Sequence, residues 1–298
     1  MSFIDLFSGI GGFRLGLERN GFRCVWSNDI DKYASGVYRR HWNDGTHVEG
    51  DIRNIEAGTI PDHDILCAGF PCQAFSFAGK RRGFNDTRGT LFHEITRIAR
   101  VKKPTILFLE NVRGLLAHDR GQTFKVILEE LGNLGYWIEW ETLCSNWFGC
   151  PQGRERVFII GHFGDEPTRT IFPIPAEINN PVRSSTKREL DLIPRAMLTP
   201  NRIDKRQNGR RLKLPNEPMF TITAQDKHGI YIGNKIRFLT PVEYERLQGF
   251  PDNWTKQWLD EAGEIRQTPE EIRRKQTGNA VTVNVIQFLG ERIRRTFN

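Results

Sequence analysis

Short apolar runs alternate with amphipathic segments over residues 1–160. A short apolar run bounded by glycine or polar residues is typical of a buried strand, whereas apolar residues spaced three and four apart are typical of a helix. The runs predict strands at residues 3–7, 22–27, 65–68, 106–109 and 157–161. The amphipathic segments predict helices at residues 13–20, about 33–38, 91–100 and 124–134. This alternation predicts an α/β fold with a parallel, doubly wound sheet that carries helices on both faces.

The pattern changes near Gly164. Eight of the chain's 15 prolines lie between residues 165 and 234, where helical periodicity is weak. Regular periodicity returns after Arg237, with helices predicted at residues 242–247 and 281–294. We therefore predict a first domain at residues 1–164, a smaller irregular β-containing domain at residues 165–235, and a hinge or connecting segment at residues 236–271.

Composition indicates a soluble globular protein, with 38% hydrophobic and 27% charged residues among 298. The apolar runs are far shorter than the roughly 20 residues that cross a bilayer, and no secretory signal is visible, so we expect a cytoplasmic protein without a membrane partner. Ten basic and three acidic residues lie between Arg183 and Lys213, a local excess that matches the formal net charge of +7. Such a basic stretch favours a polyanionic partner.

The five cysteines do not form a metal or redox motif. Their number is odd, and no two of them have the two-residue spacing of a zinc knuckle. We expect reduced thiols, most of them buried as small apolar side chains, and no bound metal.

A glycine-rich turn at residues 8–12 follows the first predicted strand. Glycine permits positive φ and close approach of the backbone to a ligand, and the helix start offers free N–H groups. Asp29 ends the next strand, where a carboxylate can accept hydrogen bonds from a ribose diol. Arg14 occupies the third glycine position of the dinucleotide fingerprint. The turn therefore predicts an adenosine cofactor without a pyrophosphate, with S-adenosylmethionine as the candidate, and disfavours a nicotinamide oxidoreductase.

Cys72 follows the third predicted strand, at the edge where open α/β sheets carry their chemistry. A cysteine thiolate is a strong nucleophile, and the polar, basic loop at residues 72–90 suits closure over a charged polymer. Glu110 ends another predicted strand, so we expect it at the same edge as Cys72. Arg154 and Arg156 lie two residues apart in an extended segment, which predicts a fork for a phosphate or a carbonyl oxygen.

Six motifs in this order resemble those of the DNA (cytosine-5)-methyltransferases, especially the small bacterial enzymes of restriction–modification systems. The similarity covers nearly the whole chain outside residues 165–235, and six ordered motifs make a chance match very unlikely. The motifs are DLFSGIGG at residues 5–12, GFPCQ at 69–73, ENV at 110–112, Q-x-R-x-R at 152–156, RFLTP at 237–241 with LQGFP at 247–251, and Q-x-GNAV at 276–281.

The resemblance implies a Rossmann-like S-adenosylmethionine-dependent methyltransferase sheet and a covalent mechanism. Cys72 would add to C6 of a cytosine that has swung out of the duplex, and C5 would then take the methyl group, leaving S-adenosylhomocysteine. Glu110 would hold N3 and the exocyclic amine. Arg156 would contact the base carbonyl, Arg154 would support the loop and backbone, and Pro71 would orient the turn.

By the same resemblance, a set of residues would bind the cofactor. Phe7 would lie on the adenine, Asp29 would hold the ribose, and Asp51 would contact the adenine. Asn279 and Val281 would close the site from the C-terminal helix, so that residues 272–298 complete the first domain. The full implied set is Phe7, Gly9, Gly11, Gly12, Asp29, Ile30, Asp51, Ile52, Leu91, Asn279 and Val281.

The proline-rich segment would be the target-recognition domain of such an enzyme. Residues 220–224 resemble the family's short Thr-Leu element, with Ile222 in place of leucine. The implied partner is double-stranded DNA, bound by a monomer that protects host DNA beside a separate cognate restriction endonuclease. The residues expected at DNA are Gln73, Ser76, Lys80, Arg81, Gln207, Asn208, Arg210, Thr221 and Ile222.

Two other functions remain open at this stage. A transfer-RNA cytosine-5 methyltransferase shares the Pro-Cys and ENV motifs, but the Cys-Phe-Thr tripeptide usual in that branch is absent here. A catalytically silent DNA-binding relative would keep the fold, although every reactive position is filled in this chain.

Overall fold

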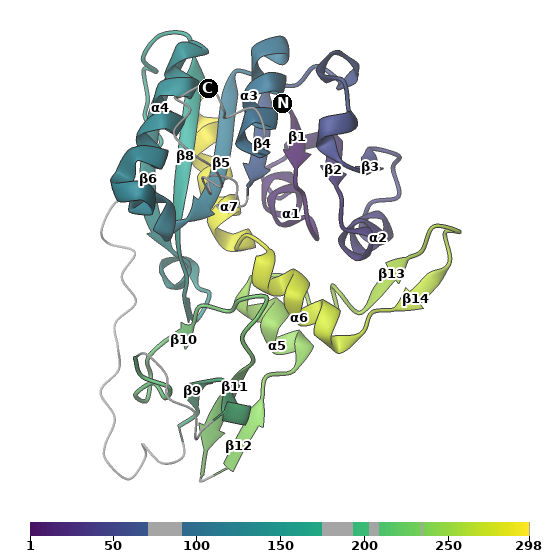
Figure 1. Cartoon of the computed structure of the whole chain (residues 1–298), viewed down its shortest axis with the longest axis vertical. Coiled ribbons are helices and arrows are strands. Elements are labelled where there is room, and N and C mark those ends of the chain that lie inside the picture. The colour runs from purple at the N-terminus through teal and green to yellow at the C-terminus, as the bar shows by residue number, and fades with distance from the viewer. Residues whose placement is uncertain (71–90, 175–192, 203–208, 234, 298) are drawn as a thin grey trace, which may run out of the picture.

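The computed structural model describes residues 1–70, 91–174, 193–202, 209–233 and 235–297 (Figure 1). A seven-stranded sheet has the strand order β3-β2-β1-β4-β5-β8-β6. Its strands are β1 (Ser2–Leu6), β2 (Arg23–Asp29), β3 (His47–Glu49), β4 (Ile65–Gly69), β5 (Ile106–Val112), β6 (Tyr136–Cys144) and β8 (Glu155–Phe163).

Helices cover both faces of this sheet, which confirms the predicted α/β class. The helices are α1 (Gly12–Glu18), α2 (Lys32–His41), α3 (Leu91–Lys102), α4 (Gln122–Asn133) and α7 (Val283–Thr296). Successive side chains of a strand point to opposite faces. In β5, Leu107 and Leu109 accordingly pack in one apolar cluster with α3 and α4, whereas Ile106 and Phe108 pack in a second cluster with α1 and α7.

The sheet is mixed, which corrects the prediction of a parallel sheet. Strands β3, β2, β1, β4 and β5 are parallel, but β8 runs antiparallel to both β5 and β6. The connection from β6 to β8 is too short for a helical crossover, so the chain returns in the opposite direction. Strand β6 was not predicted because Glu139 and Glu141 interrupt its apolar pattern. Glu139 is buried beside His162 and accepts the backbone N–H groups of Ile171 and Phe172.

The remaining elements lie below the large sheet in Figure 1. Strands β9 (Arg195–Leu198), β11 (His228–Ile232) and β12 (Lys235–Phe238) form a small antiparallel sheet, and β10 (Met219–Phe220) pairs with β7 (Gln152–Gly153). Helices α5 (Pro241–Leu247) and α6 (Glu270–Asn279) lie between the small sheet and the large one. The hairpin of β13 (Gln257–Leu259) and β14 (Ile265–Gln267) packs against α2, where Trp258 covers Gly36.

The C-terminal region differs from its prediction in one detail. Helix α7 begins at Val283, because Thr282 before it is extended, and α6 precedes it as a separate helix. Asn279 therefore ends α6 and Val281 lies between the two helices, rather than both belonging to one C-terminal helix. Within the described part of the chain, no helix combines the length and apolar character needed to cross a membrane.

The packing of α1 against α7 depends on small residues. A Cβ atom at Gly16 would lie 2.7 Å from Cβ of Ile286, closer than such atoms pack. Gly132 offers the matched control, because it lies in α4 with no atom within 4 Å of an added Cβ.

We expect Gly16→Ala to lower the free energy of unfolding by about 1–3 kcal/mol through overpacking. Gly132→Ala should raise it by about 0.5–1 kcal/mol, because alanine loses less backbone entropy in a helix. Urea denaturation of both variants measures the two shifts, and a stable Gly16→Ala protein would contradict the close α1–α7 contact.

Candidate active site

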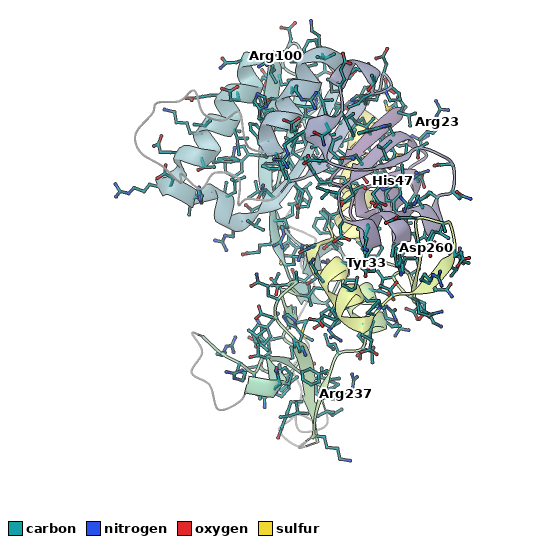
Figure 2. All side chains as sticks on the ribbon, turned by 45° about the vertical axis from the view of Figure 1, so that its right-hand side comes forward. Arg23, Tyr33, His47, Arg100, Arg237 and Asp260 are labelled. Atoms are coloured by element: carbon teal, nitrogen blue, oxygen red, sulfur yellow. The ribbon has the colours of Figure 1, made fainter. Side chains whose placement is uncertain are left out.

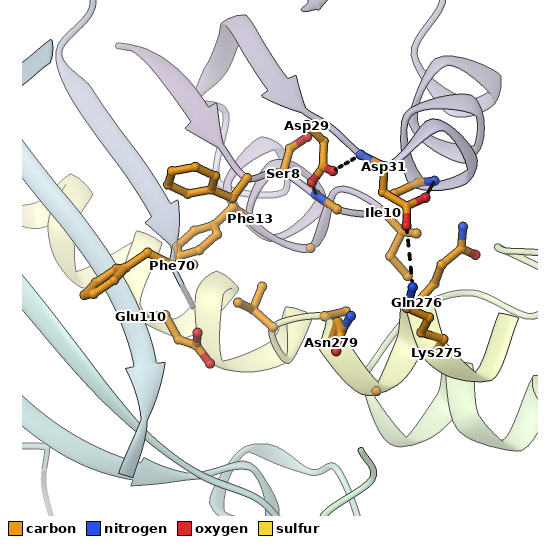
Figure 3. A pocket seen from close by; sticks show the side chains of 18 of the residues that line it. Ser8, Ile10, Phe13, Asp29, Asp31, Phe70, Glu110, Lys275, Gln276 and Asn279 are labelled. Atoms are coloured by element: carbon orange, nitrogen blue, oxygen red, sulfur yellow. Dashed lines mark hydrogen bonds and ion pairs between the residues drawn. The ribbon is translucent and has the colours of Figure 1, made fainter. Parts of the chain in front are cut away.

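A cavity of about 1010 Å³ opens at the carboxyl ends of the parallel strands, between the large sheet and α6 (Figure 3). Six separate segments of the chain line it. The first three segments contribute residues 7–10, 12 and 13, then residues 29 and 31–34, then residues 69 and 70. The other three contribute residues 110 and 112, then residues 154 and 156, and then part of residues 272–281. The cavity thus collects residues from five of the six motifs identified in the sequence. The carboxyl ends of the parallel strands β1, β4 and β5 lie at one edge of the sheet, together with the start of the antiparallel strand β8 and the end of α6.

The glycine-rich turn presents Gly9 to this cavity. Gly9 has φ +53, and a Cβ atom there would meet nothing within 4 Å. Gly11 and Gly12 are glycines for a different reason than the predicted approach of a ligand. A Cβ atom at Gly11 would lie 2.2 Å from the Trp42 ring, and one at Gly12 would lie 2.6 Å from Val281. Packing of protein against the turn, and not ligand contact alone, therefore requires these two glycines.

Asp29 holds the turn at the cavity wall. Its Oδ2 accepts the backbone N–H of Gly9 at 2.7 Å, and its Oδ1 accepts that of Asp31 at 2.8 Å. Desolvation raises the pKa of this carboxyl above its usual range. Each carboxylate oxygen has a second lone pair, so Asp29 can still accept hydrogen bonds from a ligand. Phe7, which also lines the cavity, takes a positive φ of 55° that side chains rarely adopt.

At the other end of the cavity, Glu110 and Arg156 form a mostly buried ion pair (Figure 3 shows Glu110). Arg156 Nε lies 3.1 Å from Glu110 Oε1, and the two residues come from the adjacent strands β5 and β8. Burial lowers the pKa of Arg156, while the charge of Glu110 counteracts that shift. The pair presents one carboxylate and one guanidinium to a planar polar ligand at this end.

Arg154 does not form the predicted fork with Arg156. Its side chain is 2% exposed. Nη1 donates to the carbonyls of Ile222 at 3.0 Å and Gly278 at 3.2 Å, and Nη2 donates to that of Ala280 at 2.9 Å. Burial, together with the nearby charge of Arg156, lowers the pKa of Arg154 to about 9. The guanidinium is therefore committed to three backbone carbonyls of the protein.

Two buried glutamines continue this network. Gln152 Oε1 accepts the N–H of Ile222 at 3.1 Å, and Gln152 Nε2 donates to Gln248 Oε1 at 2.9 Å. Gln248 Nε2 donates in turn to the carbonyls of Thr277 at 2.9 Å and Ala280 at 3.0 Å. Both glutamines occur in the sequence motifs, but nothing in those motifs indicated that they bind each other.

The structure brings only part of the expected cofactor set to the cavity. Phe7, Gly9, Gly12, Asp29, Asn279 and Val281 line it. Asp51 instead pairs with Arg53 through contacts of 2.9 and 3.0 Å from Arg53 Nε, and Ile30 is 67% exposed. The expected residues outside the lining are Gly11, Ile30, Asp51, Ile52 and Leu91.

Of the residues expected to contact DNA, some are described by the structure and others lie outside the described residues. Ile222 is 0% exposed and packs with Met219 and Tyr244, so its side chain is enclosed by protein. Thr221 donates its hydroxyl to Gly153 O at 2.6 Å, and Arg210 pairs with Glu217 at 2.8 Å. Outside the described residues lie Pro71, Cys72, Gln73, Ser76, Lys80, Arg81, Gln207 and Asn208.

Cations lie over aromatic rings on the small sheet and its flanking segments, a feature that the sequence analysis did not identify. Lys213 Nζ lies 4.8 Å from the centroid of the Phe220 ring, and Lys227 Nζ lies 5.9 Å from that of Phe238. Figure 2 shows Arg237 of β12 at the end of the molecule opposite Arg100. This part of the protein therefore presents basic and aromatic side chains together.

Sequence reasoning also missed the far end of the cavity. Lys275 of α6 lies across from Asp31, with Nζ 3.9 Å from Oδ2 (Figure 3). Gln276 is 7% exposed, yet neither atom of its amide group has a partner. As the first residue of the last motif, Gln276 could have been recognised as a candidate. Among the described residues, no cluster of His, Cys, Asp and Glu could hold a metal ion.

Comparisons with known proteins agree with this geometry. The family model described as C-5 cytosine-specific DNA methylase matches residues 1–195 and 183–295. The chain is 37% identical to the type II methyltransferase M.HhaI of Haemophilus parahaemolyticus over 324 aligned positions, which cover 100% of this chain and 95% of the relative. It is 40% identical to the type II methyltransferase M.NgoBI of Neisseria gonorrhoeae, with 95% of this chain and 90% of the relative covered.

Solved structures share the fold at lower identity. The S. pombe Dnmt2 methyltransferase superposes with a TM-score of 0.71 at 18% identity, over 100% of this chain and 99% of that one. A putative DNA modification methyltransferase encoded within an E. coli prophage superposes with a TM-score of 0.69 at 20% identity, over the same shares of the two chains.

We expect Arg154→Lys to lower the free energy of unfolding by about 2–3 kcal/mol, because the donors of an ammonium share one nitrogen and do not match carbonyls that two separate guanidinium nitrogens bind. Arg53→Lys is the matched control, since Arg53 is exposed and pairs with the neighbouring Asp51. It should change stability by less than about 0.5 kcal/mol. If thermal denaturation shows equal effects for the two variants, the buried hydrogen bonds of Arg154 do not contribute to the free energy of unfolding.

Proposed function

Because the chain belongs to the C-5 cytosine-specific DNA methylase family, we propose that it transfers a methyl group from S-adenosylmethionine to C5 of a cytosine within a specific duplex DNA sequence. One observation carries this proposal. A single cavity has the Glu110–Arg156 pair at one end and the Gly9–Asp29 turn along its wall. A base can bind beside the Glu110–Arg156 pair while a nucleoside cofactor lies against the Gly9–Asp29 turn.

The described residues fit S-adenosylmethionine. Asp29 has lone pairs available for the two ribose hydroxyls, Gly9 leaves room for close approach, and Phe7 provides an apolar ring at the wall. The cavity is as large as the upper range of small-molecule sites, so it has room for a cofactor together with a base. When bound, the cofactor supplies an electrophilic methyl group on a sulfonium. Asn279 and Val281 would close the same site from the side of α6.

Cys72 is proposed as the nucleophile. Phe70, two residues before it, lines the cavity, and Asn111 Nδ2 donates to Phe70 O at 2.9 Å. The thiolate would form a bond to C6, and the electron pair of the C5–C6 double bond would then form the new bond from C5 to the methyl carbon. Loss of the C5 proton to a base would restore the double bond and expel the Cys72 thiolate, with S-adenosylhomocysteine as the coproduct. Pro71 would orient the turn that carries Cys72.

Glu110 and Arg156 would recognise the base and stabilise the charge that develops on it. The Glu110 carboxylate would accept a hydrogen bond from the exocyclic amine and favour protonation at N3 as negative charge develops on the ring, and Arg156 would donate to the ring carbonyl. Their ion pair at 3.1 Å supports this assignment, because it presents a donor and an acceptor side by side. Arg154 would act through the backbone, by holding the carbonyls of Gly278 and Ala280 beside Asn279.

Double-stranded DNA is the proposed partner. The family description names DNA and not RNA as the substrate class, so we do not favour the transfer-RNA alternative. The target base must leave the duplex to enter the cavity, at a cost of a few kcal/mol. Basic and aromatic side chains around the small sheet would bind the phosphates and nearby bases. Further proposed contacts are Gln73, Ser76, Lys80, Arg81, Gln207, Asn208, Arg210 and Thr221.

A biological role follows from the curated relatives, which are named type II methyltransferases. We propose that the protein acts as a monomer in the cytoplasm and protects host DNA from a separate endonuclease that cuts the same site. Bisulfite sequencing of DNA from bacteria that express the chain tests the activity and identifies the target sequence in one experiment. Unmodified cytosines throughout would refute the proposed function.

We expect duplex DNA with 5-fluorocytosine at the target position to become covalently attached to the protein in the presence of S-adenosylmethionine. Fluorine cannot leave C5 as a proton does, so the bond to Cys72 would persist after methyl transfer. A denaturing gel should show a band at the combined mass of protein and DNA. Cys72→Ser should abolish that band, whereas Cys150→Ser, which changes a buried thiol near β7, should retain it. If all the DNA incubated with the unaltered protein runs as free DNA on this gel, the proposed covalent intermediate is excluded.

DNA affinity should fall steeply as the salt concentration rises. The slope of log K against log salt is roughly −0.9 for each phosphate that the protein neutralises. Arg195 is a third cation of this surface, with its guanidinium 6.0 Å from the centroid of the Tyr231 ring. The combined variant Arg195→Gln, Lys213→Gln and Lys227→Gln should therefore flatten the slope by about 2–3. Lys125→Gln on α4 is the control, because this exposed side chain pairs with Glu129 far from the small sheet. Fluorescence anisotropy measures the slope for each variant. If the combined variant and the control have equal slopes, these three cations do not neutralise DNA phosphates.

A further inference from the structure

Trp254 makes a hydrogen bond to the ligand-facing turn from the opposite end of the chain. Its indole Nε1 donates to the backbone carbonyl of Ile10 at 2.9 Å, across 244 residues of sequence. Ser8, Gly9 and Ile10 line the cavity, whereas Trp254 is 9% exposed and lies behind them. Trp254 belongs to none of the six motifs, and the proposed reaction does not use it.

The indole is itself held in a fixed orientation. The His41 ring stacks on it with a centroid separation of 3.5 Å and an interplanar angle of 5°. Nε2 of His41 also lies 2.7 Å from the backbone oxygen of Trp254. The rings of Phe250 and Trp42 contact the indole from other directions, at 5.6 and 5.4 Å between centroids. Trp254 can therefore direct its N–H group only toward Ile10.

The bond to Ile10 acts on the most adaptable peptide of the turn. Glycines at positions 9 and 11 both have positive φ, at 53° and 86°, and they flank Ile10. Glycine lowers the cost of rotating an adjacent peptide plane. The peptide between Ile10 and Gly11 is held at both ends, because Gly11 N–H donates to Ser8 O at 2.9 Å while Ile10 O accepts from Trp254. Without the indole, only the Ser8 contact would fix this plane.

The position of the turn matters for the proposed cofactor. Gly9 N–H binds Asp29 Oδ2 directly, so the orientation of the turn and that of the carboxylate are linked. We propose that Trp254 is a positioning residue, which holds the turn at residues 8–12 in the conformation that binds S-adenosylmethionine. This inference rests on the proposed function for the identity of the ligand. Trp254 acts before chemistry, by keeping the free protein in its binding conformation.

Trp254→Phe tests the role most directly, because phenylalanine keeps an aromatic ring over His41 but removes the N–H donor. We expect the dissociation constant of S-adenosylhomocysteine, measured by titration calorimetry, to rise about fivefold, the effect of losing one hydrogen bond. KM for S-adenosylmethionine should rise by a similar factor. In contrast, kcat with both substrates saturating and KM for DNA should remain within about twofold of the unaltered protein.

Trp140→Phe is the matched control. Trp140 lies on the edge strand β6, where it is exposed and contacts Phe124, so its replacement should leave all four quantities unchanged. If Trp254→Phe does not fold, His41→Gln takes its place. Glutamine retains a donor near the Trp254 carbonyl but loses the stacked ring, and KM for S-adenosylmethionine should again rise with kcat preserved.

The outcomes separate this inference from the proposed function. An unaltered protein that methylates DNA, with cofactor binding unchanged in Trp254→Phe, would overturn the positioning role alone. A variant with a lower melting temperature and reduced kcat, but an unchanged cofactor affinity, would also overturn it, because that result describes a merely structural residue. An unaltered protein that binds no S-adenosylhomocysteine would overturn both.

Discussion

The buried guanidinium of Arg154 joins its own segment of the chain to two others. It binds the carbonyl of Ile222 near the small sheet and those of Gly278 and Ala280 at the end of α6. A buried charge costs several kcal/mol unless hydrogen bonds compensate for it, so this arrangement is stable only when all three segments are in place. Arg156 lies two residues further along the chain, in β8, and pairs with Glu110. The wall of the cavity and its polar end are therefore positioned by Arg154, directly before β8, and by Arg156 near the start of β8.

The cavity depends on contacts that close the chain on itself. The turn after β1 is held by Asp29 from β2, by the Trp42 ring after α2 and by Trp254 after α5. The opposite wall comes from residues 272–281. This arrangement gives the site two chemically different ends on one rigid sheet, with an ion pair near β5 and β8 and a hydrogen-bonded carboxylate near β2. Such an arrangement suits a reaction between a planar base and a nucleoside cofactor.

Sequence patterns predicted the central strands and their helices well, because β1, β4 and β5 are buried on both faces and are mostly apolar, with Asp5 as the one charged residue inside β1. They missed β6, whose Glu139 is buried but satisfied by His162 and two backbone N–H groups. Side-chain identity alone does not reveal that a carboxylate has such partners. For the same reason, alternation predicted a common direction for Arg154 and Arg156 without indicating that one of them binds only backbone carbonyls.

Local composition was sufficient for the class of fold and the order of the motifs, since these follow from residue type and short-range spacing. Folding alone settled which glycines face a ligand and which face protein, whether Ile222 is accessible, and what Arg154, Gln248 and Trp254 bind. The reason is that these outcomes depend on contacts between segments as much as 244 residues apart, and many of the acceptors are backbone carbonyls. Every residue carries a backbone carbonyl, so residue type does not indicate which carbonyl accepts a particular hydrogen bond.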